Sequence, residues 1–172
     1  PVRLLDACSA PGGKLFHLTE LLAFHKIECS VAALEISNQR IKTMCDLGKR
    51  LGHNVPVLQG DASRTDWWDK KLFNHILVDA PCSSSGTIRR NPDIKLLLKE
   101  KNLQFFQQKQ LHILTNLWDK LSPGGLMFYS TCSLFREEND LLIQKLVEEK
   151  DAEILKLKVP ENVANALFTN YG

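Results

Sequence analysis

The feature that most constrains the fold of this sequence is a short apolar run that recurs five times, each time with a polar residue at or just after its end. Each run has the length of a buried strand, and stretches of helix length separate the runs. Buried strands that alternate with helices predict an α/β fold, with a mostly parallel sheet and helices on both faces. The runs and their polar residues are, in chain order, Val2–Ala7 with Asp6, Val31–Ile36 with Glu35, Val55–Leu58 with Asp61, His75–Val78 with Asp79, and Leu126–Ser130 with Cys132.

Helices are predicted between these strands from apolar spacing and from end signals. The long third helix is expected to stop at residues 122–125, a Ser-Pro-Gly-Gly stretch. A sixth strand is predicted over Glu153–Leu157. The predicted helices are one that carries Leu15, Leu18 and Leu22, one between Ser37 and Gly52, one with an apolar face from Leu103 to Leu121, and one over about Glu137–Glu149.

Length and composition predict one globular domain over residues 1–172, because 44% of the residues are hydrophobic and no apolar run is long enough to span a membrane. The five cysteines include no CxxC pair, and the histidines lack ligand spacing, so we expect free thiols in a reducing, cytoplasmic setting and no metal. The net charge is only +2. A nucleic-acid partner would therefore require a local basic patch.

The polar residues at the strand ends predict a binding site at one edge of the sheet. Ligands of open parallel sheets bind beyond the carboxyl ends of the strands, near the switch in strand order. For any single strand, an acidic residue at the end is equally well explained as solvated loop. Because all five strands share the feature, we favour a site.

The first of these loops has the character of a cofactor loop. Gly12 and Gly13 allow a ligand to approach the backbone closely at a helix start. The loop is neither a GxGxxG fingerprint nor a Walker loop, because no Ser or Thr follows Lys14. A carboxylate at Glu35 is placed to bind ribose hydroxyls, and one at Asp61 to accept from an adenine amino group. This pattern favours S-adenosylmethionine, with NAD as the alternative.

The loops after the fourth and fifth strands each carry a cysteine. Cys82 and Cys132 lie in polar loops, which suits a reactive thiolate better than a buried small hydrophobe. Cys29 and Cys45 fit the hydrophobe interpretation. A reactive thiolate needs a lowered pKa, and Lys14 is one candidate source of positive charge.

Two further groups are candidates for contact with a nucleic acid. Arg89 and Arg90 follow the Cys82 loop and are suited to hold phosphates of an entering strand, with a solvated basic surface as the alternative. Trp67 and Trp68 offer stacking surfaces for a base, but such residues more often pack at the core or its rim.

Three motifs together resemble those of the RNA cytosine-5 methyltransferases. They are DACSAPGGK at residues 6–14, LVDAPCSSSGTIRRNPDIK at residues 77–95 and YSTCS at residues 129–133. Within the family the likeness is greatest to the Sun/Fmu branch, that of bacterial 16S ribosomal RNA methyltransferase B. The resemblance runs from about Val2 to Leu146. It implies a Rossmann-like class I methyltransferase domain that acts on RNA with S-adenosylmethionine as cofactor.

The resemblance also implies roles for individual residues. Cys132 resembles the nucleophile that attacks carbon 6 of the cytosine, and Cys82 resembles the cysteine involved in release of the product. Asp79 resembles the acid beside both cofactor and target base, and Lys14 is also implied to touch the base. Glu35 resembles the ribose-binding acid, where the family often has Asp. The remaining residues of the implied cofactor site are Cys8, Ser9, Ala10, Pro11, Gly12, Gly13 and Asp61.

The roles of the two cysteines could also be reversed. DNA cytosine methyltransferases attack with the cysteine of a Pro-Cys pair, and Pro81-Cys82 is such a pair. Because a DNA enzyme does not need the Thr131–Ser133 element, we assign the attack to Cys132. The sequence is also compatible with a non-catalytic module that binds S-adenosylmethionine and assembles RNA, and with an oxidoreductase on the same fold.

The resemblance further implies parts that this sequence does not contain. Family members usually have an N-terminal RNA-binding domain and a last strand rich in aromatic residues. We therefore expect a fragment that lacks the last strand, binds the cofactor, and by itself methylates RNA weakly or not at all. No obligate protein partner is indicated.

Overall fold

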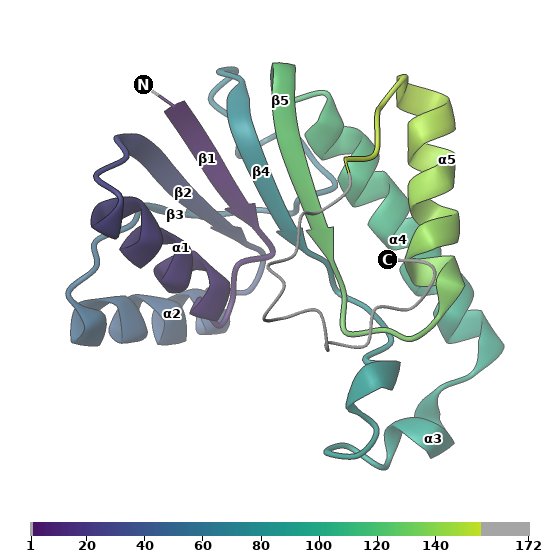
Figure 1. The fold of residues 1–172 in the computed structure, drawn as a ribbon. Coiled ribbons are helices and arrows are strands. Elements are labelled where there is room, and N and C mark those ends of the chain that lie inside the picture. The colour runs from purple at the N-terminus through teal and green to yellow at the C-terminus, as the bar shows by residue number, and fades with distance from the viewer. Residues whose placement is uncertain (1, 156–172) are drawn as a thin grey trace, which may run out of the picture.

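A single sheet of five parallel strands in the order β3-β2-β1-β4-β5 forms the centre of the computed structural model, which describes residues 2–155 (Figure 1). The strand order reverses between β1 and β4, which is the switch point where α/β sheets bind ligands. The α/β fold with a parallel sheet is confirmed. The strands are β1 (Val2–Ala7), β2 (Cys29–Glu35), β3 (Val57–Gln59), β4 (Phe73–Asp79) and β5 (Leu121–Ser130).

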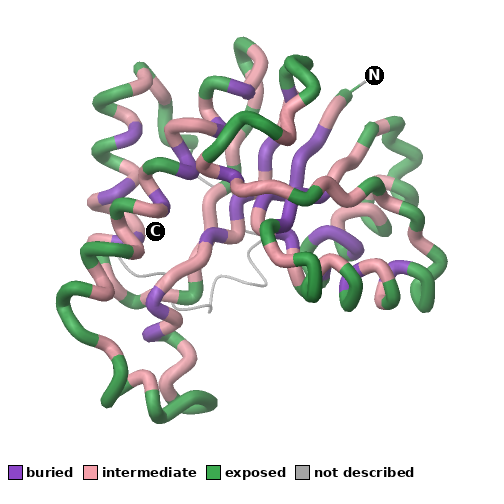
Figure 2. The backbone as a smooth tube through the Cα atoms, turned by 180° about the vertical axis from the view of Figure 1, so that it is seen from behind, coloured by how far each residue is buried: buried purple, intermediate pink, exposed green. Residues whose placement is uncertain are grey.

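Helices cover both faces of this sheet. One buried cluster joins β1, β2 and β4 to α4 and α5 through residues such as Leu5, Leu114 and Leu142. A second cluster joins the other face of β2 to α1 and α2 through Phe16 and Met44. In Figure 2 the buried positions gather on the central strands and on the inward turns of the helices. The helices are α1 (Gly13–Phe24), α2 (Asn38–Leu51), α3 (Ile94–Leu97), α4 (Glu100–Trp118) and α5 (Asp140–Lys150), with 3-10 helices η1 (Ser85–Thr87) and η2 (Arg136–Glu138).

The predicted ends of α2 are confirmed in detail. The Ser37 hydroxyl accepts a hydrogen bond from the Arg40 amide at 3.4 Å, and Gly52 ends the helix with φ of 76°. Ser37 lies two residues after Glu35, so the cap of α2 also fixes where β2 ends.

Two predicted boundaries are wrong at β5. The apolar spacing places Leu121 on the face of the preceding helix, but it pairs with Phe73 as the first residue of β5. Pro123, Gly124 and Gly125 form no helix stop and no loop; they lie inside the strand, where the register shifts between the Phe73 and His75 pairings. Gly124 has φ of 72°, so it supplies the backbone conformation that this irregularity requires.

The sixth strand is not formed by residues 153–155, the only part of Glu153–Leu157 that the structure describes. Residues 156 and 157 lie outside the described residues. The predicted helix over Glu137–Glu149 begins instead as η2 and continues as α5, and the sequence pattern predicts neither η1 nor α3.

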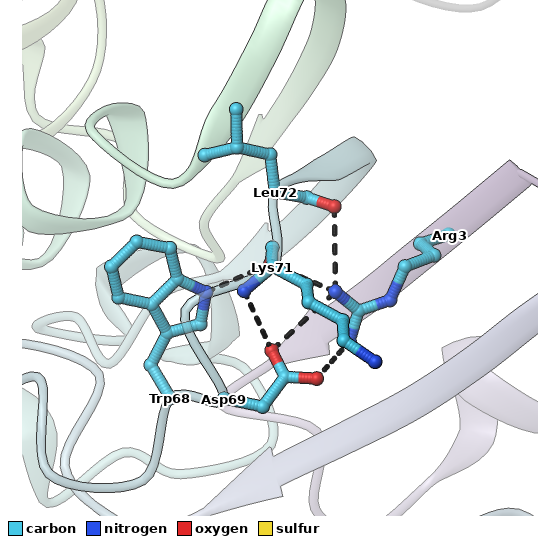
Figure 3. A network of polar contacts seen from close by, with 5 residues as sticks. All are labelled: Arg3, Trp68, Asp69, Lys71 and Leu72. Atoms are coloured by element: carbon cyan, nitrogen blue, oxygen red, sulfur yellow. Dashed lines mark hydrogen bonds and ion pairs between the residues drawn. The ribbon is translucent and has the colours of Figure 1, made fainter.

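The amino end of β1 anchors the segment between β3 and β4, on the side of the sheet away from the carboxyl strand ends (Figure 3). Arg3 donates a hydrogen bond to the Lys71 carbonyl at 2.8 Å and forms an ion pair with Asp69 at 2.8 Å. The hydrogen bond from the Lys71 amide, and then the hydrogen bond and charge of Arg3, lower the pKa of Asp69. The Trp68 indole donates to the same Lys71 carbonyl at 2.9 Å. This network fixes the end of the segment, directly before β4 begins at Phe73.

Candidate active site

The loop between β1 and α1 holds its backbone close to the carboxyl end of β2. The Ser9 amide donates to the Leu34 carbonyl at 3.0 Å, and the Ser9 hydroxyl donates to Asp6 at 2.8 Å. Gly12 has φ of 99°, and a Cβ there would lie 2.7 Å from the Phe16 ring. A Cβ on Gly13 would meet no atom of the described residues within 4 Å. The loop is therefore tightly packed against Phe16 at Gly12, whereas Gly13, the first residue of α1, borders open space.

Glu35 is the buried acid of this edge, with only 3% of its surface exposed. Its two carboxylate oxygens accept from the Ala10 amide at 3.3 Å and from the Ser37 amide at 2.9 Å. These contacts tie the cofactor loop, β2 and α2 to one carboxylate. Each oxygen keeps acceptor capacity for a further donor.

Asp61 follows β3 and lies at the same edge. Its Oδ1 accepts from the amide of Ser63 at 2.9 Å and from its hydroxyl at 2.7 Å. Partial burial raises the pKa of Asp61, but the hydrogen bonds from Ser63 and the charges of Lys109 and Arg64 outweigh it, and the net pKa is lowered. Asp61 is therefore ionised at neutral pH, and its Oδ2 has acceptor capacity for a further donor.

Asp79 connects the first loop to the fourth and fifth strands. Its Oδ2 forms an ion pair with Lys14 Nζ at 2.6 Å, and its Oδ1 accepts from the Ser130 hydroxyl at 2.8 Å. Asp79 and Ser130 are register partners at the ends of β4 and β5. Lys14 therefore reaches across the switch point, from α1 to β4.

Cys82 and Cys132 lie side by side, with their Sγ atoms 3.2 Å apart. Cys132 is exposed and also lies 3.5 Å from the Ser84 hydroxyl, while Cys82 is half-buried. Burial, together with its hydrogen bond to Cys132, raises the pKa of Cys82 to about 11. At neutral pH Cys82 therefore keeps its proton.

Cys8 is poorly suited to thiolate chemistry. Burial, with the nearby negative charges of Glu35 and Asp6, raises the pKa of Cys8 to about 12. Its side chain packs against the larger core cluster, and its backbone takes φ of 60°. The structure thus places Cys8 in the loop as a packing residue with an unusual backbone conformation.

The two nucleic-acid candidates differ in exposure. Arg89 and Arg90 lie on the turn between η1 and α3, in the same connection as Cys82; Arg89 and Arg90 are both exposed. Trp67 and Trp68 instead pack against the core, and the Trp67 indole donates to the Asp61 carbonyl at 2.9 Å. The packing interpretation of the two tryptophans is therefore the one the structure supports.

Sequence reasoning missed Glu138, whose side chain is completely buried between the two cysteine loops. It lies in the run Arg136-Glu137-Glu138-Asn139-Asp140, which has the composition of a solvated helix start. The one signal in the sequence is its position, a few residues after the Thr-Cys-Ser element. Its partners Ser83 and Ser133 lie inside the quoted motifs and Gln110 lies in the predicted long helix, but the sequence pattern gave none of them a role.

The edge of the sheet fits an adenosine cofactor in the chemistry of its donors and acceptors. The open space at Gly13 leaves the start of α1 accessible, and Glu35 and Asp61 offer carboxylates from adjacent strands. Among residues 2–155 no group of three or more His, Cys, Asp or Glu is arranged to hold a metal ion. Within the same range no helix has the length and apolar character needed to cross a membrane.

Comparison with known proteins gives a match over nearly the whole chain. Residues 2–170 match the family model described as 16S rRNA methyltransferase RsmB/F. The chain is 41% identical over 160 residues to ribosomal RNA small subunit methyltransferase B of Escherichia fergusonii. That alignment covers 92% of this chain and 36% of the relative, so the chain spans about a third of the curated relatives it matches.

Two solved structures from Pyrococcus horikoshii have the same fold. One is a methyltransferase homolog protein with 31% identity and a TM-score of 0.77; the match covers 92% of this chain and 49% of the other. The second is NSun6 with SFG, an analogue of S-adenosylmethionine, with 29% identity and a TM-score of 0.75. Here the match covers 85% of this chain and 36% of the other.

Proposed function

The chain belongs to the 16S rRNA methyltransferase RsmB/F family, and from this premise we propose that it transfers a methyl group from S-adenosylmethionine to carbon 5 of a cytosine in RNA, with 16S ribosomal RNA as the expected substrate. The observation that carries the cytosine chemistry is the pair of thiols 3.2 Å apart in the loops that follow β4 and β5, at the edge of the sheet where Asp79 ends β4. Carbon 5 of cytosine is a weak nucleophile, and a thiolate that adds to carbon 6 activates it.

The cofactor is held by the loop of residues 8–14 together with Glu35, Asp61 and Asp79. Glu35 binds the ribose hydroxyls, and Asp61 accepts from the adenine amino group. The hydrogen bonds from Ala10 and Ser37 orient the Glu35 carboxylate for this contact. When bound, the cofactor supplies an electrophilic methyl group to the carboxyl edge of the sheet.

Cys132 is the nucleophile in this mechanism. Its thiolate adds to carbon 6, and the electron pair of the carbon 5–carbon 6 double bond makes carbon 5 nucleophilic. Carbon 5 takes up the methyl group, loses its proton to solvent, and re-forms the double bond as the Cys132 sulfur leaves. Two observations support this assignment. Cys132 is the more exposed of the two thiols, and Cys82 keeps its proton at neutral pH.

Cys82 assists the release step. With a pKa of about 11 it carries its proton at neutral pH, so its thiol can donate a hydrogen bond to the departing Cys132 sulfur 3.2 Å away. That hydrogen bond stabilises the leaving thiolate. Cys82 is therefore needed for turnover rather than for attack.

Asp79 and Lys14 hold the edge of the target base. The Asp79 carboxylate accepts from the cytosine amino group, and Lys14 donates from the opposite side of the same ion pair. The Ser130 hydroxyl fixes the other carboxylate oxygen. Arg89 and Arg90 contact phosphates of the RNA strand, and the target base is looped or flipped out, since a paired base hides carbon 6.

Covalent trapping tests this proposal most directly. RNA that contains 5-fluorocytosine lacks the carbon 5 proton, so the adduct cannot be released and persists on a denaturing gel. In the full-length protein we expect an adduct that maps to Cys132. Cys132→Ala abolishes the adduct, Cys82→Ala retains it, and Cys45→Ala serves as the matched thiol control on α2.

Two outcomes contradict the proposal in different ways. An adduct that maps to Cys82 overturns the order of the two cysteines but keeps the chemistry. A folded protein that binds both RNA and S-adenosylhomocysteine but forms no adduct overturns the catalytic function, and favours a module that binds cofactor and RNA without catalysis.

A further inference from the structure

Glu138 on η2 is a buried carboxylate that joins the loop carrying Cys82 to the loop carrying Cys132. Its surface is completely buried. Oε1 accepts from the Ser83 amide at 2.9 Å, and Oε2 accepts from the hydroxyls of Ser83 and Ser133. Ser83 directly follows Cys82, and Ser133 directly follows Cys132. One side chain therefore fixes the residue next to each thiol.

Helix α4 provides a third point of attachment. The Gln110 amide nitrogen donates to Glu138 Oε1 at 2.9 Å and to the Pro81 carbonyl at 2.9 Å. Gln110 is itself completely buried. Through Gln110 and Glu138, both cysteine loops are thus hydrogen-bonded to α4, which packs on the sheet, as well as to each other.

The backbone of the two loops is also in close contact. The Gly86 amide donates to the Cys132 carbonyl at 2.9 Å, and a Cβ on Gly86 would lie 2.8 Å from that oxygen. The Ser85 hydroxyl accepts from the Leu134 amide at 2.8 Å. The approach of the loops therefore depends on several contacts, and the Glu138 carboxylate is the group that bonds to the residue after each cysteine and to α4 as well.

The chemistry of the donors around Glu138 indicates an orienting role. A buried carboxylate is costly unless its lone pairs are satisfied, and here both oxygens accept from two donors each. All these donors are neutral amides or hydroxyls, whose directions are fixed by the carboxylate geometry. Loss of these acceptors, as in Glu138→Ala, would remove a shared hydrogen-bond partner from both loops at once, while the direct contact between the Ser83 and Ser133 hydroxyls at 3.1 Å would remain.

We infer that Glu138 is a positioning residue that sets the separation of the Cys82 and Cys132 sulfurs. This separation determines whether Cys82 can donate its hydrogen bond to the Cys132 sulfur when that sulfur leaves. The catalytic consequence rests on the proposed function, whereas the geometric claim does not. Glu138 contacts the residues that follow the two cysteines and is assigned no contact with substrate or cofactor.

A thiol-bridging reagent measures the geometric claim without RNA or cofactor. Dibromobimane becomes fluorescent when it links two thiols a few ångström apart, and the same protein with Cys82→Ser gives the background. In the full-length protein Glu138→Ala is expected to slow bridging by about ten-fold, because small misplacements of reacting groups have large effects on rate. Glu137→Ala, which removes the neighbouring carboxylate of η2, is expected to leave bridging unchanged.

Glu138→Gln distinguishes positioning from charge. The Gln oxygen can accept from the Ser83 and Gln110 amides, and its nitrogen can donate to the two serine hydroxyls, which then act as acceptors. We therefore expect Glu138→Gln to bridge at the wild-type rate. Loss of bridging in the Gln variant, with an unchanged unfolding temperature, would overturn the positioning role.

Activity and cofactor binding complete the test. Glu138→Ala is expected to lower kcat by about 100-fold with KM for S-adenosylmethionine unchanged, and Glu138→Gln is expected to restore it. If Glu138→Ala does not fold, Ser133→Ala takes its place. This variant removes the hydroxyl that donates to Glu138 and is expected by itself to slow bridging. Wild-type bridging in a folded Glu138→Ala protein, or in Ser133→Ala where that variant must replace it, refutes the inference. If the wild-type protein does not methylate cytosine but Glu138→Ala still slows bridging, only the proposed function is refuted.

Discussion

Cys82 and Cys132 are 50 positions apart in the sequence, yet their Sγ atoms lie 3.2 Å apart beyond the ends of β4 and β5. Their meeting follows from topology. The two strands are parallel neighbours, so their carboxyl ends and the loops beyond them share one edge. The half-buried Cys82 and the exposed Cys132 then differ in access to solvent, although both are thiols.

The first prediction concerns the order in which these thiols react. Cys132 is expected to be alkylated by iodoacetamide at pH 8 well before Cys82, because burial and the contact with Cys132 raise the pKa of Cys82 to about 11. Mass spectrometry of the peptides at successive times measures the order. Cys8, with a pKa of about 12, serves as the internal slow control. Faster modification of Cys82 would contradict the prediction.

The second prediction concerns two adjacent glycines with opposite surroundings. Gly12→Ala is expected to destabilise the fold by about 2 kcal/mol, because φ is 99° and the new Cβ would lie 2.7 Å from Phe16 and 2.8 Å from Met44. Gly13→Ala meets nothing within 4 Å and is expected to fold normally. Urea unfolding of both variants measures the difference.

The same pair tests where the cofactor lies. If the open space at Gly13 is occupied by S-adenosylmethionine, Gly13→Ala weakens the binding of S-adenosylhomocysteine in calorimetry although the fold is intact. Unchanged affinity in Gly13→Ala would place the cofactor elsewhere.

The sequence predicted that the residues of the candidate site gather at one edge, because a parallel sheet places its carboxyl strand ends together. Asp79 and Lys14 could be assigned to that edge from the pattern, and they form an ion pair there. The pattern does not predict the distance between them. That distance depends on where α1 begins, and α1 begins at Gly13, directly before Lys14.

The parts that could not be predicted are those where tertiary context overrides local signals. Pro123, Gly124 and Gly125 have the composition of a helix stop, but pairing with β4 draws them into a strand with a shifted register. Glu138 has the composition of a solvated surface, but the Ser83 and Gln110 groups that satisfy it come from segments distant in sequence. No local pattern identifies a buried carboxylate whose donors lie 28 and 55 positions away.

The third prediction concerns the buried acid of the proposed ribose site. Both Glu35 oxygens accept from backbone amides, so Glu35→Gln leaves one amide facing an N–H group. We expect a loss of about 1 to 3 kcal/mol in the free energy of unfolding, together with weaker binding of S-adenosylhomocysteine. Glu28→Gln, which changes a carboxylate in the segment before β2, is the control. Wild-type stability and affinity of Glu35→Gln would argue against both roles.

The last prediction concerns the pH dependence of stability through Asp6. Asp6 is 1% exposed at the end of β1, and its Oδ1 has no hydrogen-bond partner among the described residues. Burial raises its pKa from 3.8 to about 6; the negative charge of Asp79 adds to this, while the Ser9 hydrogen bond and Lys14 oppose it. The native state therefore holds the Asp6 proton more tightly than the unfolded chain does.

The sign of the effect follows from this proton balance. Between about pH 4 and pH 6 the native state binds more protons at Asp6, so the Asp6 contribution to stability falls as pH rises, by about 2 to 3 kcal/mol in total. The difference in unfolding free energy between wild type and Asp6→Asn should change by that amount across this range and stay constant below it. Asp66→Asn, which changes an exposed carboxylate, is the matched control. A pH-independent difference between wild type and Asp6→Asn would show that folding does not raise the pKa of Asp6.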